Sequence, residues 1–462
     1  MSPTSRTFAA LIGASLILAA APRSQAVHRD AATARPEPAD QAVEATSVEL
    51  LGLLPDGHEK RRFLLDCTGC HRMDAASVFS DGGARSRDEW RTVVERMLSY
   101  AGWRSDFPVI SAGRDPAETA DWLARHWSDP TAAARGGAPT AAVDSPASEV
   151  REYPYPHAMD LPHDLAVDDD GRVIITGMFT HKMLVLDPIH GEYRDVPIPV
   201  PEANPRALDL DEDGDWWVLL GAPNRVARYD PVSDEWRSWD IGVYGHSIRP
   251  DRQGRAWFNG HFTKAPVRLG YVDGSTGETR FFDVPGPAPA ADGAGPIPYG
   301  LRIGPDGSVW MTELHGNRLV RLDPATGEFR IWTLPTAYSG PRRPDVGPDG
   351  TVWIPEYAAG KLARFDPRTE RFTEYDLPIA DALPYVVRLD PDRGRVWVGT
   401  GAADAVFVFD PERERFGIVP LPTRGALIRH IDVDPATGEL WAAYGASPGI
   451  PPRIARIRLP SG

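Results

Sequence analysis

The sequence predicts a multidomain protein in which a small all-α domain precedes an all-β, seven-bladed propeller. Apolar residues recur at helical spacing between residues 47 and 130. From residue 150 to residue 462 short β-type runs, turns and tryptophans repeat about every 43 residues. Residues 131–149 between the two parts are rich in Ala, Gly, Pro, Thr and Ser, and we expect them to form a flexible linker.

The first 26 residues have the features of a secretory signal peptide. A basic residue, Arg6, precedes the apolar run Phe8–Ala21, and a small-residue site ends at Ala26. The run is too short to span a membrane. Residues 27–46 are expected to be a disordered lead-in. We therefore expect a periplasmic or secreted protein with no membrane span.

The charge of the chain argues against a nucleic-acid partner. Cleavage after Ala26 would remove two arginines and move the formal net charge from −15 to −17. Nucleic-acid binding usually needs a basic surface. A redox partner protein or a small-molecule substrate is the expected partner.

Three helices are expected between residues 47 and 130. The first covers residues 57–65 and runs directly into the stretch 67–71. Ser86 and Glu89 have the spacing of a capping box and open a second helix. Asp115-Pro116 opens the last one. The apolar residues expected on the inner faces of the last two helices are Trp90, Val93, Val94, Met97, Leu98, Trp122, Leu123 and Trp127.

The stretch Cys67-Thr68-Gly69-Cys70-His71 holds the only two cysteines of the chain. Cys-x-x-Cys-His is the attachment sequence of a c-type haem, because two thiolates add to the vinyl groups and the imidazole reaches the iron. The alternatives are half of a zinc site, a thioredoxin-like redox pair and a disulfide. Zinc would need a second ligand pair at similar spacing, and the βαβ setting of a thioredoxin-like pair is absent. We predict one covalent haem c on Cys67 and Cys70, with His71 on the iron.

The sixth iron ligand must come from the opposite side of the porphyrin. Met73 is only two residues beyond His71 and cannot reach around the ring. Met97 lies on the apolar face of the next helix and is the predicted ligand, since a Met/His pair suits electron transfer. The alternatives are that Met97 is only a core residue and that His126 is the ligand.

The order of helix, haem motif, helix and helix resembles that of a small class I cytochrome c. The resemblance covers about residues 47–130. It implies that the haem is attached outside the cytoplasm, which agrees with the predicted signal peptide.

The repeats are clearest at their glycine turns, which occur once in each repeat. Each turn has an alternating strand on either side, and two further strands follow. Four strands at a period near 43 residues indicate a β-propeller, and seven repeats indicate seven blades. The turns are Asp170-Gly171, Asp213-Gly214, Gln253-Gly254, Asp306-Gly307, Asp349-Gly350, Arg393-Gly394 and Thr437-Gly438.

The two ends of the propeller predict how the ring closes. The seventh repeat ends without a fourth strand, whereas Val150–Pro156 resembles the fourth strand Phe372–Pro378 of another repeat. We expect the first strand of the domain to complete the last blade, which removes a free sheet edge.

The repeats resemble those of the virginiamycin B lyase family, the streptogramin B lyases. The resemblance rests on blades such as Gly304–Glu313 followed by Gly316–Leu319, and it extends over residues 150–459. It implies a seven-bladed propeller and, as a possible activity, elimination that opens a cyclic depsipeptide.

Strand alternation locates a candidate site at the mouth of the central channel. In each first strand the apolar residues show which alternate positions point toward the channel. The residue two positions before them therefore lies at the mouth of the channel. The seven residues found in this way all carry polar or aromatic side chains. They are His163, Arg206, His246, Tyr299, Arg342, Tyr385 and Arg429. The second strands return to the same face, where they end at Glu313 and Glu356, with His261 and His315 close to the equivalent place.

The family resemblance implies a histidine base and a magnesium ion held partly by glutamate. The family places the glutamate fourteen residues after the histidine. Here the partners of Glu313 and Glu356 at this spacing are Tyr299 and Arg342. The residues fourteen positions after His163 and His246 are glycines. The lyase constellation is thus split between blades, and His246, Glu313, Glu356, His163 and Tyr299 are the catalytic candidates.

The arginines suggest another use for the mouth. Arg206, Arg342, Tyr385 and Arg429 are candidate binding residues for an anionic ligand, because guanidinium groups match carboxylate and phosphate. Alternatively, each arginine only pairs with a carboxylate of a neighbouring blade. The stretch 286–298 enters the fourth blade on the same face and is a candidate cover for the mouth.

We predict an extracytoplasmic c-type haem protein with a role in electron transfer, whose propeller binds a substrate or partner. One alternative is a lyase of the virginiamycin B lyase type with an appended cytochrome. The other is a propeller that binds without catalysis. Oxidoreductase activity is favoured over carbon-oxygen lyase activity. A magnesium ion near Glu313, Glu356 and His246 is a further possibility, although no motif requires it.

Overall fold

The computed structural model describes residues 45–80, 83–102, 105, 109–110, 113–133, 146–260, 266–286, 296–445 and 450–460. The expected signal peptide, nearly all of the lead-in, most of the linker and most of the stretch 286–298 lie outside these residues, as does His261. The described residues belong to one unit, Glu44–Gly462.

Residues 47–133 are mainly helical. The helices are α1 (Ser47–Gly52), α2 (His58–Cys67), α3 (Ala75–Val78), α4 (Arg87–Ala101), α5 (Pro116–His126) and α6 (Pro130–Ala133), and a small hairpin is formed by β1 (Phe79–Ser80) and β2 (Gly83–Ala84). The predicted capping box is present, because Ser86 and Glu89 each accept from the other's backbone N–H. Asp115 caps α5, which has Pro116 in its first turn.

Two tryptophans, Trp127 and Trp90, lie in the core of the helical part. Trp127 is fully buried, and its indole N–H donates to the Leu50 carbonyl at 2.8 Å. Its ring lies 5.4 Å from that of Trp90 and 5.6 Å from that of Phe63. These contacts join α1, α2 and α4 to the end of α5.

The predicted seven-bladed propeller is confirmed. Seven four-stranded antiparallel sheets follow one another along the chain. The first sheet contains β4 (Pro162–Val167), β5 (Val173–Gly177), β6 (Lys182–Asp187) and β7 (Glu192–Pro197), and the second β8 (Pro205–Leu210), β9 (Trp216–Gly221), β10 (Asn224–Asp230) and β11 (Glu235–Asp240). The third contains β12 (Gly245–Pro250), β13 (Arg255–Gly260), β14 (Arg268–Asp273) and β15 (Thr279–Asp283), and the fourth β16 (Pro298–Ile303), β17 (Val309–Glu313), β18 (Arg318–Leu322) and β19 (Phe329–Thr333).

The remaining blades follow the same order. The fifth contains β20 (Asp345–Val346), β21 (Val352–Glu356), β22 (Lys361–Asp366) and β23 (Arg371–Asp376), and the sixth β24 (Pro384–Asp390), β25 (Arg395–Thr400), β26 (Ala405–Asp410) and β27 (Arg415–Pro420). The seventh contains β28 (Ile428–Val433), β29 (Leu440–Tyr444), β30 (Arg453–Arg458) and β3 (Glu149–Pro154). The glycines of all seven predicted repeat turns have positive φ, which explains why glycine recurs there.

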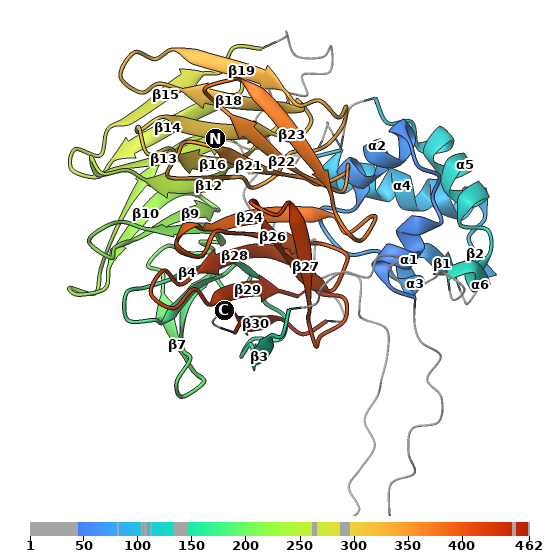
Figure 1. Cartoon of the computed structure of the whole chain (residues 1–462), viewed down its shortest axis with the longest axis horizontal. Helices are drawn as coiled ribbons and strands as arrows, with labels where there is room; N and C mark the ends of the chain where they lie inside the picture. Colours follow the sequence, from blue (N-terminus) through green and yellow to red (C-terminus); the bar gives the residue numbers. More distant parts are fainter. Residues whose placement is uncertain are drawn as a thin grey trace, which may run out of the picture. The chain divides into compact units, whose positions relative to one another are not determined.

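The predicted closure of the ring is also confirmed. Strand β3 pairs antiparallel with β30, so that Val150 lies opposite Ile457 and Tyr153 opposite Ile454. Figure 1 shows β3 beside β30 although about 300 residues of sequence separate them. The first strand of the propeller therefore completes its last blade and covers an edge that would otherwise be free.

The helical part and the propeller share one apolar cluster. Leu50, Phe63 and Trp127 of the helices belong to the same cluster of buried side chains as Tyr357 and Leu383 of the propeller. This continuity means that the first helices pack directly on the ring.

Candidate functional site

The mouth residues are directed into the channel by β-bulges at the starts of the first strands. In β4 the pairing jumps from Pro162 to Leu165, so that two residues, His163 and Asp164, lie opposite the single residue Thr176. The Thr176 hydroxyl accepts from the backbone N–H of Asp164 at 2.9 Å. Register shifts at the equivalent place occur in β8, β12, β16, β24 and β28. Such bulges turn a strand locally and redirect side chains.

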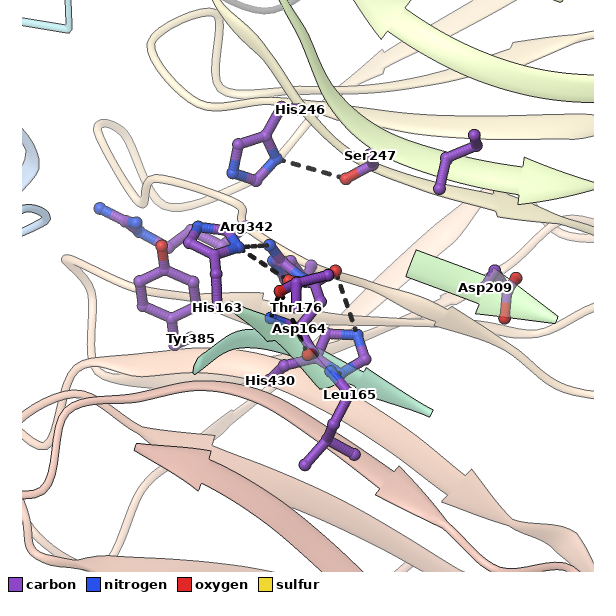
Figure 2. A network of polar contacts seen from close by, with 12 residues as sticks. His163, Asp164, Leu165, Thr176, Asp209, His246, Ser247, Arg342, Tyr385 and His430 are labelled. Atoms are coloured by element: carbon purple, nitrogen blue, oxygen red, sulfur yellow. Dashed lines mark hydrogen bonds and ion pairs between the residues drawn. The ribbon is translucent and has the colours of Figure 1, made fainter. Parts of the chain in front are cut away.

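Two histidines lie on neighbouring sides of the mouth. The rings of His163 and His246 are 6.0 Å apart and nearly perpendicular, and Figure 2 shows His246 above His163 with Tyr385 beside them. The Nδ1–H of His163 donates to Asp164 at 2.8 Å, and that of His246 donates to the Tyr299 carbonyl at 2.9 Å. In the neutral form both imidazoles therefore have their basic nitrogen at Nε2. Burial lowers the pKa of His163 to about 4, so this ring is neutral at physiological pH.

A tyrosine pair and an arginine form the neighbouring side of the mouth. The hydroxyls of Tyr299 and Tyr385 are hydrogen-bonded, and Arg342 Nη1 donates to Tyr299 Oη at 2.6 Å. The Arg342 guanidinium also lies 3.8 Å above the Tyr357 ring and 4.4 Å above that of Tyr385. Burial raises the pKa of Tyr299, whereas at Tyr385 the charges of Arg342, Arg429 and Arg343 outweigh burial and lower the pKa.

A second layer of charged residues below the mouth was missed by the sequence analysis. Arg343 Nη1 pairs with Asp164 Oδ1 at 2.8 Å, which links the fifth blade to the first across the channel. His430 Nε2 lies 3.7 Å from the other Asp164 oxygen. Simple alternation along a strand directs Asp164, Arg343 and His430 away from the channel. Only a bulge in the strand allows such a residue and the mouth residue before it to point inward together. The signal available in the sequence was the unusual run of two polar residues at a strand start, as in His163-Asp164 and Arg342-Arg343.

The two candidate glutamates have different surroundings. Glu313 is fully buried and paired with Arg318, with Nη2 2.9 Å from Oε1. Glu356 is also buried, and within the described chain its carboxylate oxygens make no hydrogen bond of normal geometry. Burial raises the pKa of Glu356 to about 8, so it is largely protonated at neutral pH. Neither glutamate presents an available charged oxygen to His163 or His246.

These residues do not fit a magnesium site. Magnesium prefers several oxygen ligands in octahedral geometry, whereas the Glu313 carboxylate is engaged by Arg318 and Arg342 brings a positive charge to the mouth. Among the residues that the structure describes, no group of three or more His, Cys, Asp or Glu side chains could hold a metal ion.

The candidate binding arginines contact neutral oxygens in the described part of the chain. Arg206 binds the side-chain oxygen of Asn204 and stacks 3.9 Å above the Tyr244 ring. Burial lowers the pKa of Arg206 to about 9. Arg429 donates to the carbonyl of Cys70 at 2.7 Å. The expected alternative, in which each of these arginines pairs with a carboxylate of the next blade, is not what these contacts show.

The stretch between the two cysteines covers the mouth. The Tyr357 hydroxyl donates to the Thr68 carbonyl at 2.9 Å and lies 2.9 Å from Thr68 Oγ1. A Cβ atom on Gly69 would lie only 2.7 Å from Arg342 Nη2, so glycine permits this close approach. The mouth residues are accordingly buried, with Tyr385 2% and Arg342 2% exposed. The propeller donors thus bind backbone carbonyls of the chain itself.

Outer contacts hold the helical part in the same place. Lys60 pairs with Asp381 at 2.8 Å, with only 5% and 13% of the two side chains exposed. Arg61 donates to the Ala337 carbonyl at 2.9 Å, and His315 Nε2 lies 2.7 Å from the Val109 carbonyl oxygen. His315, which the sequence placed near the second-strand ends, therefore serves the contact with the helical part.

A cavity of about 200 Å³ in the helical part brings together three of the four predicted haem residues, and the fourth, Cys70, is not among the residues that line it. Cys67, His71 and Met97 all line it, and so do Trp90 and Leu123. The remaining lining is largely apolar. The Nδ1–H of His71 donates to the Arg72 carbonyl at 2.9 Å, which leaves Nε2 as the basic nitrogen. His126 is not among the residues that line the cavity.

The cavity also contains polar donors that the described residues do not satisfy. These are the indole N–H of Trp90, Arg85 Nε and Arg114 Nη2. Buried donors are normally paired, so a ligand with an apolar body and acidic groups at its edge matches this lining. A haem with its two propionates has this chemistry, and the residues present fit it.

The cysteines do not resemble a redox-active pair. Cys67 and Cys70 form no disulfide. Burial raises the pKa of the Cys67 thiol to about 12, whereas thioredoxin-like chemistry needs a thiol with a lowered pKa.

No helix within the described ranges is long and apolar enough to cross a membrane. This finding concerns the helices of residues 45–133, since the rest of the described chain is mainly strand.

Comparison with known proteins supports the propeller. The profile of the virginiamycin B lyase family matches residues 288–457. A streptogramin B lyase structure is 21% identical with a TM-score of 0.59, covering 68% of this chain and 98% of that one. Selenomethionine-substituted virginiamycin B lyase from Staphylococcus aureus is 20% identical with a TM-score of 0.58, covering 68% of this chain and 100% of that one.

A third similar structure is hydrazine synthase from Kuenenia stuttgartiensis, 16% identical with a TM-score of 0.51, covering 63% of this chain and 94% of that one. No curated protein sequence matches the chain. At these identities the structures establish the fold, and together with the family profile they show a seven-bladed propeller that is virginiamycin B lyase-like. They favour the lyase-type interpretation of the propeller, and they do not test the predicted haem.

Proposed function

We propose that this protein is a periplasmic or secreted electron-transfer protein, in which a helical domain with one covalent haem closes the mouth of a virginiamycin B lyase-like propeller. The observation that carries the proposal is the cavity shared by Cys67, His71 and Met97. These residues come from two helices and the turn after α2, and the first two belong to the attachment motif.

The residues have separate roles in this proposal. Cys67 and Cys70 would hold the haem by thioether bonds. His71 Nε2 would bind the iron, with Nδ1 fixed by the Arg72 carbonyl. Met97 would bind from the opposite side. Bound in this way, a haem supplies reversible one-electron transfer.

Three polar side chains around the cavity complete the proposed site. Trp90, Arg85 and Arg114 would donate to the propionates, since all three residues line the cavity and each has a buried nitrogen without a hydrogen-bond partner in the described chain. The apolar lining excludes water. Exclusion of water and neutralised propionates both favour the less charged, reduced state of the iron.

The propeller provides the platform for this domain. Because Arg429 and Tyr357 bind the carbonyls of Cys70 and Thr68, the ring fixes the backbone on which the haem would be attached. An electron-transfer site should change its geometry little when the iron is oxidised or reduced. A backbone held at two carbonyls would keep that geometry fixed. Electrons would exchange with a redox partner protein or a small-molecule donor through the helical part.

The experiment is a comparison of ligand variants in protein produced with haem-attachment machinery. In Met97→Ala the visible band of Met-ligated ferric haem should disappear and the midpoint potential should fall, because a thioether ligand raises the potential. His126→Ala is the matched control and should retain both. An unchanged spectrum in Met97→Ala, or loss of the band in His126→Ala, would overturn the assignment of Met97.

A second candidate function is depsipeptide elimination of the virginiamycin B lyase type. The family profile and the similar lyase structures favour it, and His163 and His246 present basic Nε2 nitrogens at the mouth. In this reaction one imidazole removes a proton from carbon, the C–O bond breaks and the oxygen leaves as carboxylate. The helical part would have to move away first, because the chain from Thr68 to Cys70 covers the mouth.

Incubation with a streptogramin B depsipeptide tests this second candidate. The ring-opened isomer, detected by mass spectrometry and lost in His246→Ala or His163→Ala, would support the lyase. No product from the folded, haem-loaded chain would exclude it while leaving the haem proposal untouched.

A further inference from the structure

The channel of the propeller has a second polar cavity, away from the haem motif. Its volume is about 360 Å³, and it lies where the first strands end, as Pro250, Ile303, Leu389 and Val433 in its lining show. The mouth at the other end of these strands is covered by the helical part. A small ligand of the propeller can therefore reach the channel at this cavity.

One position in each first strand supplies the charged lining. It is the residue directly after the inward apolar residue, and six of the seven blades place an arginine or an aspartate there. In blade order the residues are Ala166, Asp209, Arg249, Arg302, Asp345, Arg388 and Asp432. Three arginines and three aspartates thus face one cavity.

Because of this order, positive side chains are neighbours on one side of the cavity and negative side chains are neighbours on another. Arg249 and Arg302 come from β12 and β16, which are in contact, and no carboxylate lies between them in the ring. On another side Asp432 and Asp209 flank the small residue Ala166 of β4, which contacts both β28 and β8. Two adjacent guanidinium groups match a carboxylate, whereas two carboxylates around a gap match an ammonium group.

The ion pairs satisfy the charges unequally. Arg302 is well paired with Asp345 at 2.8 Å. Arg249 Nε lies 3.5 Å from Asp209 Oδ2, so this ion pair is loose, and the buried Nε makes no hydrogen bond of normal geometry among the described residues. Only 8% of Arg249 is exposed. A buried donor whose acceptor is this distant would gain from a closer one, and Arg249 lines the cavity in which such an acceptor can bind.

The acidic side is also incompletely satisfied. Burial raises the pKa of Asp209 and of Asp432 to about 7, and the charge of Asp209 adds to the shift at Asp432. Asp432 has Arg388 at 3.4 Å, but that guanidinium is shared with His430 Nε2 at 2.7 Å. A cationic group between the two aspartates would relieve their repulsion.

We propose that this cavity binds a small zwitterion of the amino-acid class, with its carboxylate at Arg249 and Arg302 and its ammonium group at Asp209 and Asp432. This site is independent of the haem. A purely structural role of the charges, in which three ion pairs fasten neighbouring blades, explains Arg302–Asp345 at 2.8 Å but leaves Arg249 and Asp209 3.5 Å apart and Arg388 and Asp432 3.4 Å apart.

Calorimetric titration of the full chain tests the proposal. The probes are glycine, 4-aminobutyrate and 6-aminohexanoate, which differ in the distance between their charges, and the half-ligands acetate and methylammonium. At least one amino acid should bind about tenfold more tightly than either half-ligand, as expected when charged hydrogen bonds form at both ends.

Variants locate the site. Arg249→Gln and Asp209→Asn should each weaken the binding of that amino acid by about tenfold or more. Asp376→Asn, at an 86% exposed side chain on the outer strand β23, is the matched control and should bind unchanged. No binding of any amino acid, acetate binding as tightly, or unchanged affinity in Arg249→Gln would overturn the proposal. If the variants fold poorly, the comparison of amino acids with half-ligands in the unaltered chain decides alone.

Discussion

The contact between Thr68 and Tyr357 gives a measurable test of how the helical part docks on the propeller. The Tyr357 hydroxyl donates to the Thr68 carbonyl and lies 2.9 Å from Thr68 Oγ1, and both residues are buried. Tyr357→Phe removes the donor and leaves a buried carbonyl without it. The free energy of unfolding should fall by about 1–3 kcal/mol, the usual cost of an unsatisfied buried group.

A double-mutant cycle isolates the contact from other effects. Thr68→Val removes the hydroxyl, which also donates to the Leu64 carbonyl at 2.6 Å, and keeps the volume. The two substitutions together should cost less than their sum, with a coupling energy of about 0.5–1.5 kcal/mol. Urea unfolding followed by tryptophan fluorescence and circular dichroism gives each value.

The control pair combines Thr68→Val with Tyr271→Phe. Tyr271 packs on Trp257 in the third blade, 4.9 Å between ring centroids, away from Thr68. These effects should add within about 0.5 kcal/mol. If the pair is equally additive and Tyr357→Phe alone leaves the free energy of unfolding unchanged, the haem motif is not docked on the ring in solution and the platform role of the propeller is wrong.

Three further changes test the fold and the electrostatics. Phe407→Ala, at a fully buried position in β26, should cost about 3–5 kcal/mol in urea unfolding, and a loss below 1 kcal/mol would contradict the packing. Deletion of residues 149–154 should expose β30 as an edge and cause association in light scattering; a stable monomer would contradict the closure. Because burial raises the pKa of Glu356 from 4.5 to about 8, the folded state holds this proton, and stability falls as the pH rises through this window. Glu356→Gln should remove that loss, so its stability relative to the unaltered chain should improve by roughly 1.4 kcal/mol per pH unit between pH 5 and 8, and a constant difference would refute the shift.

The propeller could be predicted because its signals are local and repeated. A glycine with positive φ stands at each of seven turns, so the blade count follows from the sequence. The closure was visible because residues 150–156 copy the fourth strand of another blade. Even the face of α4 was predictable, since helical spacing directs Met97 toward Trp90 and Val94.

The arrangement of the mouth could not be predicted by the same means. Strict alternation assigns one channel-facing residue to each first strand, whereas the bulges direct both His163 and Asp164 inward. The Arg318 partner of Glu313 comes from the next strand and could have been found from the hairpin pairing. The cover over the mouth depends on contacts such as Arg429 with Cys70, about 360 residues apart, for which the local pattern holds no signal.

The identification of the helical part as a cytochrome stays a prediction from its motif and its cavity. The comparisons concern the propeller, and they favour lyase chemistry there. The two interpretations differ in what the helical part does, because a covering that fixes a haem has no need to open, whereas a lyase requires an open mouth.

The most direct measurement is the haem content of the purified full-length chain, produced with haem-attachment machinery and then denatured. The account predicts one haem per chain that stays bound in denaturant, by intact mass and by the absorbance of the pyridine adduct, and that is lost in the Cys67→Ala, Cys70→Ala variant. Folded full-length protein whose mass equals that of the polypeptide alone would contradict the account and leave the lyase-like propeller as the functional part.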